Sequence, residues 1–187
     1  MEIVRLAIPE VCLLTPTRHG DERGFFSETY NINTLAALGL DLTFVQDNHA
    51  YSAQPGTVRG LHFQVHPHAQ AKLIRVVRGA IFDVAVDVRR GSPTYGQHVS
   101  AVISARAGNQ ILVPVGFAHG LCTLEPDTEV LYKVTGCYDR ACDLGLAWND
   151  PALRIEWPVA PGEAIVSERD CRLPSLEALP SYFEYGS

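Results

Sequence analysis

The chain has 187 residues, of which 47% are hydrophobic and 19% are charged, as expected for a globular protein with a sizeable core. Its formal net charge of -6 argues against a nucleic-acid-binding surface, because phosphate recognition depends on clustered lysine and arginine. Neither a transmembrane helix nor a signal peptide is predicted, since no run approaches about 20 apolar residues and the N-terminus lacks a basic start.

The five cysteines are odd in number and form no CxxC pair, so we expect reduced structural thiols of a cytoplasmic protein. Turn residues recur at intervals of roughly ten positions, which is typical of many short strands. The first predicted element is instead a short helix over 34–38, capped by Asn33 and closed by Gly39.

Strands are predicted over 73–78, 80–90, 110–115 and 128–134. The segment 80–90 alternates at the two-residue period of a strand. One face carries Ala80, Phe82, Val84, Val86 and Val88, and the other carries Asp83 and Asp87. Pro114 indicates that 110–115 is an edge strand or reaches the end of a strand.

From about residue 148 the sequence is irregular and rich in proline, which indicates a wrapping tail rather than a second domain. Ser175 is expected to cap a single turn near the C-terminus. We therefore predict one domain over residues 1–187, with an all-β jelly-roll barrel or sandwich and a few short peripheral helices.

Two segments, 60–79 and 108–123, resemble the cupin motifs in the spacing of their glycines, prolines and histidines. Together they predict a cupin jelly roll. The first segment departs from the pattern, because Lys72 stands where cupins prefer an acidic residue. A carboxylate there would help to hold a divalent cation, whereas an ammonium group repels one.

The histidines leave two interpretations open. A metal site would use His66, His68 and His119, since imidazole is a suitable ligand for several transition metals. Alternatively, His66 and His68 are loop residues at a turn around Pro67, and the chemistry lies elsewhere.

An acid/base site fits the neighbouring residues. The Lys72 ammonium could stabilise an enolate oxygen, although lysine at a strand start can equally be a solvated charge. Enolate chemistry also needs a base and an acid, and His62 and Tyr132 have suitable side chains. The sequence alone does not bring these residues together.

Longer motifs resemble the dTDP-4-dehydrorhamnose 3,5-epimerases, in the family's order and over most of the chain. They are RGFFSE at 23–28, FVQDNHA at 44–50, GTVRGLHFQ at 56–64, QAKLIRVVRGAIFDVAVDVRRGSPTYG at 70–96, VPVGFAHG at 113–120, LYK at 131–133, LAWNDP at 146–151 and SERD at 167–170.

The resemblance implies a cupin enzyme of deoxysugar biosynthesis that needs no metal and no cofactor. Its expected reaction converts dTDP-4-dehydro-6-deoxyglucose to dTDP-4-dehydrorhamnose by epimerisation at carbons 3 and 5 through enolate intermediates. Epimerisation at one carbon only, or of a related nucleotide sugar, is the alternative that the sequence leaves open. A homodimer that shares its N-terminal strands is also implied, with no nucleic-acid or membrane partner.

The resemblance also implies catalytic roles. His62 would remove the carbon-bound protons, and Asp170 would orient and polarise its imidazole. Lys72 would stabilise the enolate oxygen at carbon 4, and Tyr132 would return a proton from the opposite face. A non-catalytic sugar-nucleotide binder is the less favoured alternative, because binding alone needs neither a base nor an acid.

Substrate-binding roles follow from the same resemblance. Arg23 and Arg59 match the arginines that contact the diphosphate, for which guanidinium groups are well suited. The other positions that the resemblance assigns to substrate binding are Phe26, Glu28, Gln46, Asp47, Asn48 and His119. Tyr138 would stack on the base, and Asp143 and Arg169 would also contact the substrate, although some family members carry Glu and Lys there. Without the resemblance, Phe26 would be interpreted as a core residue and the segment 46–48 as a polar turn.

Overall fold

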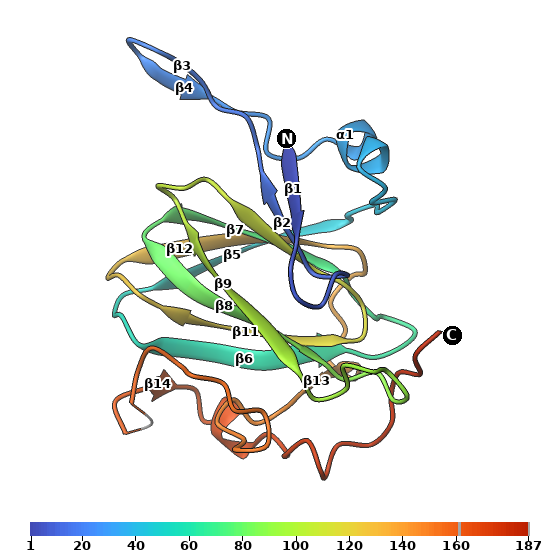
Figure 1. The fold of residues 1–187 in the computed structure, drawn as a ribbon. Helices are drawn as coiled ribbons and strands as arrows, with labels where there is room; N and C mark the ends of the chain where they lie inside the picture. The colour runs from blue at the N-terminus through green and yellow to red at the C-terminus, as the bar shows by residue number, and fades with distance from the viewer. Residues whose placement is uncertain (161, 187) are drawn as a thin grey trace.

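The structure, a computed structural model, describes residues 1–160 and 162–186 and consists mainly of two β-sheets packed face to face (Figure 1). The first sheet is antiparallel, with the strand order β1-β2-β10-β7-β12-β5. Its strands are β1 (Glu2–Arg5), β2 (Cys12–Thr15), β10 (Gln110–Val113), β7 (Lys72–Arg78), β12 (Thr128–Val134) and β5 (Gln46–Ser52).

The second sheet has the order β13-β6-β11-β8-β9, and β14 adds to β6 as a parallel strand. Its strands are β13 (Asp143–Gly145), β6 (Thr57–Gln64), β11 (Phe117–Thr123), β8 (Ala80–Asp87), β9 (His98–Ser104) and β14 (Ile165–Val166). The remaining elements are the hairpin of β3 (His19–Asp21) and β4 (Gly24–Phe26), the helix α1 (Ile32–Ala37) and the 3₁₀ turn η1 (Asp170–Arg172). The predicted all-β cupin sandwich with short peripheral helices is confirmed.

The main hydrophobic core lies between the sheets and includes Ile81 and Ala85 of β8. Ile74, Leu121 and Val130 belong both to this core and to the wall of a large cavity. The cavity therefore borders a closely packed interior, which gives its polar side chains a rigid support.

Both faces of β8 are buried. The face with Val84 and Val86 packs against residues of the C-terminal tail, including Leu153 and Phe183. Figure 1 shows this tail, coloured orange to red, running along the outside of the second sheet near β6. These contacts cover the face of β8 that carries Val84 and Val86, while the opposite face, which carries Ile81 and Ala85, places Asp83 in the protein interior.

The outer face of the first sheet is partly covered by α1, whose Leu35 is fully buried. The helix begins two residues earlier than predicted, because Asn31 is its cap and accepts the backbone N–H groups of Asn33 and Thr34. Gly39 follows its end with a φ of +78°, as the sequence indicated.

Two other local predictions are confirmed. β10 ends at Val113, so Pro114 lies just beyond the strand. The Ser175 hydroxyl accepts the backbone N–H of Ala178 at 3.4 Å, which closes the expected turn. All five cysteines are free thiols. No helix of the described residues has the length and apolar character needed to cross a membrane.

Candidate active site

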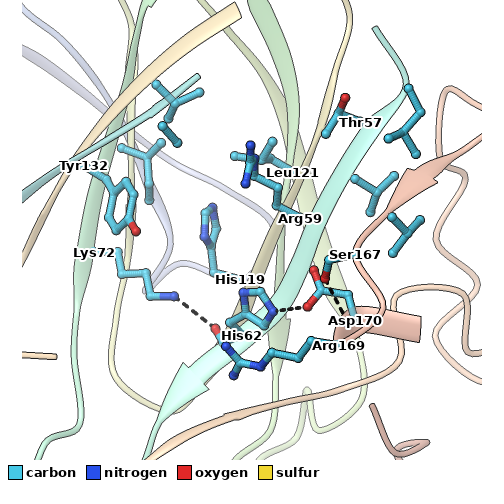
Figure 2. A pocket seen from close by; sticks show the side chains of 16 residues that line it. Thr57, Arg59, His62, Lys72, His119, Leu121, Tyr132, Ser167, Arg169 and Asp170 are labelled. Carbon is cyan, nitrogen blue, oxygen red and sulfur yellow. Dashed lines mark hydrogen bonds and ion pairs between the residues drawn. The ribbon is translucent and has the colours of Figure 1, made fainter. Parts of the chain in front are cut away.

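A cavity of about 510 Å³ opens between the two sheets (Figure 2). One wall consists of residues of β5, β7 and β12, and the other consists of residues of β6 and β11. The segment from β14 to η1 closes one side of the cavity. Because strand neighbours alternate between faces, β7, β11 and β12 each contribute two side chains that are two positions apart.

His62 and Asp170 form a hydrogen-bonded pair within the cavity. The His62 Nε2 donates to Asp170 Oδ1 at 2.7 Å, and the Gly60 N–H donates to Oδ2 at 3.2 Å. Burial alone would raise the pKa of Asp170, but the interactions with His62 and Gly60 outweigh it and lower the pKa. An ionised carboxylate at Nε2 leaves Nδ1 of the neutral imidazole free of its proton, so this nitrogen can act as a base.

Gly60 allows this pair to form. Its φ of +123° suits glycine, and a Cβ there would lie 2.5 Å from the Gly120 Cα. The close approach brings β6 against β11, where His62 and His119 are register partners just before a local shift of pairing. Asp170 reaches His62 from η1, and its own N–H donates to the Ser167 hydroxyl at 3.1 Å.

Lys72 begins β7 and points across the cavity toward His62 (Figure 2). Its Nζ donates to the His62 carbonyl oxygen at 3.1 Å. Burial lowers the pKa of Lys72 to about 8, while the charges of Asp143 and Asp83 oppose that shift. The residue is therefore no solvated surface charge, and its ammonium lies where a carbonyl oxygen in the cavity can meet it.

Tyr132 lies on β12, beside Lys72 and across the cavity from His62 (Figure 2). Burial is the main cause that raises the pKa of its phenol, so the hydroxyl keeps its proton at neutral pH. A molecule between the two sheets would have a potential base on one side and a potential acid on the other.

A second histidine–carboxylate pair was missed by the sequence interpretation. His119 Nε2 donates to Asp83 Oδ2 at 2.8 Å, and Asp83 is completely buried. Burial raises the pKa of Asp83, opposed by His119 and Lys72, and its Oδ1 has no hydrogen-bond partner in the described residues. The alternation of 80–90 contained the signal, because an aspartate inside a doubly buried strand needs a polar partner.

A smaller cavity of about 250 Å³ adjoins the first and shares His62, Lys72, Tyr132 and Arg169 with it. Its rim joins three of the predicted binding residues. The Tyr138 hydroxyl donates to Asp143 Oδ2 at 3.2 Å, and Arg169 Nη1 pairs with the same oxygen at 2.7 Å. Gln46 and Asn48 of β5 complete this part of the wall and are hydrogen-bonded to each other at 2.8 Å.

Arg59 lines the larger cavity at the end of β6 away from Gln64. Its guanidinium donates to the Tyr51 carbonyl oxygen at 2.9 Å and to the Ser52 hydroxyl at 3.2 Å. No carboxylate within the described residues pairs with Arg59, so it remains available to an anionic group.

Four predicted binding residues line neither of the two cavities of their own chain. Arg23 and Phe26 belong to the β3–β4 hairpin, which projects from the sandwich (Figure 1). Phe26 is 73% exposed, so it is no core residue. Glu28 accepts hydrogen bonds from Asn31 and Thr34 near α1. Asp47 lies within a strand, not a turn, and pairs with Lys133 at 2.6 Å on the outer face.

The alternative metal ligands do not come together. His66 packs edge-on against Phe183, with ring centres 5.9 Å apart, and His68 approaches Asp139 at 3.7 Å. Both lie in the turn around Pro67, whereas His119 lies in the cavity. Among residues 1–160 and 162–186, no group of three or more His, Cys, Asp or Glu side chains is placed to bind a metal. The turn interpretation of His66 and His68 is confirmed.

Comparison with known proteins agrees with this architecture. The family model described as dTDP-4-dehydrorhamnose 3,5-epimerase matches residues 5–178. A dTDP-4-dehydrorhamnose 3,5-epimerase of Sinorhizobium fredii is 53% identical over 96% of this chain and 92% of its own. A Bacillus anthracis enzyme of the same name, solved with TDP and PPi bound, is 49% identical with a TM-score of 0.90, covering 93% of this chain and 98% of its own.

A third relative carries a sugar nucleotide. The dTDP-6-deoxy-D-glucose-3,5-epimerase of Legionella pneumophila, solved in complex with dTDP-4-keto-L-rhamnose, is 36% identical. Its TM-score is 0.94, with 100% of this chain and 99% of its own covered. The fold and these matches define the chain as an isomerase built on a cupin jelly roll. More narrowly, it belongs to the dTDP-4-dehydrorhamnose 3,5-epimerase family.

Proposed function

We propose that this chain converts dTDP-4-dehydro-6-deoxyglucose to dTDP-4-dehydrorhamnose by inverting carbons 3 and 5, as a step of dTDP-rhamnose biosynthesis. One observation carries the proposal. The hydrogen-bonded His62–Asp170 pair faces Lys72 and Tyr132 across a cavity large enough for a sugar ring. Family membership over nearly the whole chain supports the choice of substrate.

The first step is proton removal by His62. Its Nδ1 takes the proton from carbon 5, and the electrons of the broken C–H bond move into the adjacent ketone to form an enolate. Asp170 stays ionised at Nε2 and stabilises the imidazolium that results. The same base would act again at carbon 3, because both carbons flank the carbon-4 ketone.

Lys72 stabilises the enolate oxygen. The proton at carbon 5 is acidic only because its carbanion delocalises onto that oxygen, so a nearby cation lowers the barrier directly. The ammonium of Lys72 is oriented by the His62 carbonyl at 3.1 Å and kept in a partly desolvated site. Such a charge acts more strongly in the cavity than it would in water.

Tyr132 returns the proton from the opposite side. Protonation of the enolate carbon by the phenol leaves the carbon inverted. The Tyr132 phenolate then recovers a proton from solvent and the His62 imidazolium releases one, which restores both groups before the second carbon reacts. The separation of His62 and Tyr132 on facing walls is what favours inversion over simple exchange. If Tyr132 reaches only one of the two carbons productively, the result is mono-epimerisation, which remains the alternative function.

We further propose that the smaller cavity and Arg59 bind the rest of the substrate. Arg59 would contact the diphosphate, since its planar guanidinium suits paired phosphate oxygens. Gln46, Asn48, Asp143, Arg169 and His119 would contact the sugar and the adjoining phosphate, and Tyr138 would stack on the base. Asp47 is paired to Lys133 on the outer face, so any role of Asp47 in this proposal is indirect.

A homodimer would give the projecting hairpin a function. Its strand β4 carries Phe25 and Phe26, which are 62% and 73% exposed, and its turn carries Arg23. Exposed aromatic clusters of this kind mark binding surfaces. We propose that each hairpin reaches the partner's cavity, so that Arg23 and Phe26 contact the nucleotide there, with Glu28 holding the hairpin base through α1.

Mixing two inactive variants tests the dimer proposal. Arg23→Ala and His62→Ala homodimers, unfolded together and refolded, should form heterodimers in which one cavity has both residues intact. We expect activity to reappear in the mixture and not in either variant refolded alone. If Arg23 acts within its own chain, no cavity of the heterodimer is complete, and the mixture stays inactive.

The reaction itself is tested by incubation with dTDP-4-dehydro-6-deoxyglucose in deuterated water, followed by NMR. Deuterium at both carbons 3 and 5, with the inverted product, is the expected result. Incorporation at one carbon would favour the mono-epimerase. A substrate that returns without deuterium would overturn the assignment.

Two broader expectations accompany this proposal. We propose that residues 1–187 act as one domain, because the tail packs against β8 and supplies Asp170 to the cavity. We also propose a cytoplasmic location, which suits free thiols such as Cys137 on the surface.

A further inference from the structure

The rim of the smaller cavity is held by a residue that takes no part in the proposed chemistry. The segment between β12 and β13, residues 135–142, carries Tyr138 and leads directly to Asp143. Two consecutive backbone N–H groups of this segment donate to glutamine side chains. Tyr138 N donates to Gln46 Oε1 at 2.9 Å, and Asp139 N donates to Gln64 Oε1 at 2.8 Å.

Gln64 lies at the end of β6, two residues beyond His62, and only 4% of it is exposed. Its amide nitrogen donates to the His68 carbonyl at 2.7 Å and to the Cys137 carbonyl at 3.2 Å. With the bond accepted from Asp139, both donors and the acceptor of the amide are engaged by backbone groups. The Gln64 head group therefore has little capacity left to bind a substrate directly.

These three bonds join two segments that border the cavity. His68 belongs to the turn that leads into Lys72, and Cys137 and Asp139 flank Tyr138. Buried backbone groups that lose such partners must find water or move, so the segment 135–142 would shift if Gln64 were removed. The shift would carry with it the Tyr138 hydroxyl and its contact with Asp143.

We propose that Gln64 is a positioning residue that holds Tyr138, Asp143 and Arg169 in place around the bound nucleotide sugar. This inference rests on the proposed function, because it assigns the rim to substrate binding. Gln64 also lines the smaller cavity, but because backbone groups engage its amide, it acts on the substrate through the segment 135–142. Its loss should therefore weaken binding of the substrate more than it slows proton transfer at His62, which is fixed separately by Asp170.

The test compares Gln64→Met with Gln97→Met in epimerisation assays with dTDP-4-dehydro-6-deoxyglucose. Methionine keeps the length of the side chain and removes all three bonds. Gln97 is an exposed glutamine whose amide donates to the Pro93 carbonyl at 3.3 Å, outside both cavities. We expect Gln64→Met to raise KM about tenfold and to change kcat by less than about threefold, whereas Gln97→Met changes neither.

A double-variant cycle separates positioning from a general loss of structure. If Gln64 acts through Tyr138, then Gln64→Met combined with Tyr138→Ala should raise KM little more than the larger single change. The inference is overturned if the KM increases of the two single variants multiply in the double variant. It is also overturned if Gln64→Met leaves KM unchanged or lowers kcat alone. Should Gln64→Met not fold, Gln64→Glu replaces it. This change keeps the acceptor for Asp139 and removes both donors, and a KM equal to that of the unaltered enzyme would then overturn the inference.

The unaltered enzyme is measured beside the variants. If it produces no epimerised product, the proposed function fails whatever Gln64 does. If it turns over normally and Gln64→Met has the same KM, only the positioning role fails.

Discussion

The molecule contains two histidine–carboxylate pairs of nearly the same length on neighbouring strands, and their surroundings differ. His62–Asp170 spans 2.7 Å with a side chain of His62 that is 27% exposed, whereas His119–Asp83 spans 2.8 Å with His119 11% exposed. Both oxygens of Asp170 accept hydrogen bonds, while one oxygen of Asp83 has no partner in the described residues.

This difference sets the state of each carboxyl group. The pKa of Asp170 is lowered by its hydrogen bonds despite burial, so an ionised Asp170 holds the proton of His62 at Nε2 and can stabilise the imidazolium. The pKa of Asp83 is raised by burial, so its support for His119 is weaker. Equal distances therefore do not make equal catalytic pairs, because hydrogen bonding and desolvation decide the charge.

The largest expected effect is the difference in the loss of kcat between His62→Gln and His119→Gln. Glutamine can keep a hydrogen bond to each carboxylate but cannot accept a proton. We expect His62→Gln to reduce kcat about a thousandfold, with exchange lost at both carbons, and His119→Gln to reduce it about tenfold. Deuterium incorporation followed by NMR measures both. Equal losses would mean that the two histidines share the task of base.

A smaller effect is expected from the carboxylates. Asp170→Asn should reduce kcat about a hundredfold, because the amide neither stabilises the imidazolium nor fixes its tautomer. Asp83→Asn should reduce kcat by less than about tenfold, since the group it replaces is less readily ionised. Steady-state rates at neutral pH provide the measurement. A greater loss in Asp83→Asn would reverse the assignment of the two pairs.

Lys72 interacts with both pairs, through the His62 carbonyl and the charge of Asp83, and its titration is expected to set the alkaline limit of activity. Its ammonium is the active form, and with a pKa of about 8 in the folded enzyme the charged fraction falls as pH rises above that value. We expect kcat to fall about tenfold for each pH unit well above the pKa. Lys72→Arg, which stays charged, should lower activity but remove this alkaline fall. An identical alkaline limb in Lys72→Arg would assign the titration to another group.

The smallest expected effect is on the pH dependence of the free energy of unfolding. Its sign is opposite for Asp170 and Asp83. Asp170 has a folded pKa below its usual 3.8, so its stabilisation is present above pH 3.8 and is lost as pH falls below it. Asp83 has a folded pKa above 3.8, so stability declines as pH rises from 3.8 through that higher value.

Urea unfolding of the two asparagine variants across this range tests the signs. Relative to the unaltered enzyme, Asp170→Asn should lose less stability on acidification, and Asp83→Asn should lose less on the way from pH 4 to neutral pH. Each difference should be about 1 kcal/mol. Parallel curves for the two variants would show that their environments do not differ as described.

Much of the site could be anticipated from sequence because long motifs matched one family. His62, Lys72, Tyr132 and Asp170 were predicted together, and the structure brings all four to one cavity. Spacing alone was misleading, since it drew attention to His66 and His68, which lie in a turn outside that cavity. The spacing of the motif residues indicates the cupin fold. Which side chains meet in the cavity depends on the three-dimensional structure.

Other features depended on information that a strand pattern does not contain. The alternating pattern put Asp83 and Val84 on different faces of the strand. It did not indicate that both faces of β8 are covered, because the tail that covers one face begins about 60 residues later. The same two-residue period separates Asp47 from Gln46 and Asn48, but only after the segment is known to be a strand rather than a turn.

The origin of Asp170 in the tail has a consequence for how the enzyme becomes active. Of the proposed catalytic residues, His62, Lys72 and Tyr132 lie in strands formed by residues 57–134, whereas their carboxylate partner arrives 108 positions after His62. During synthesis, the strands up to β12 can therefore pair before the catalytic histidine has its carboxylate partner. The enzyme becomes active only when the last segments dock and bring Asp170 to His62.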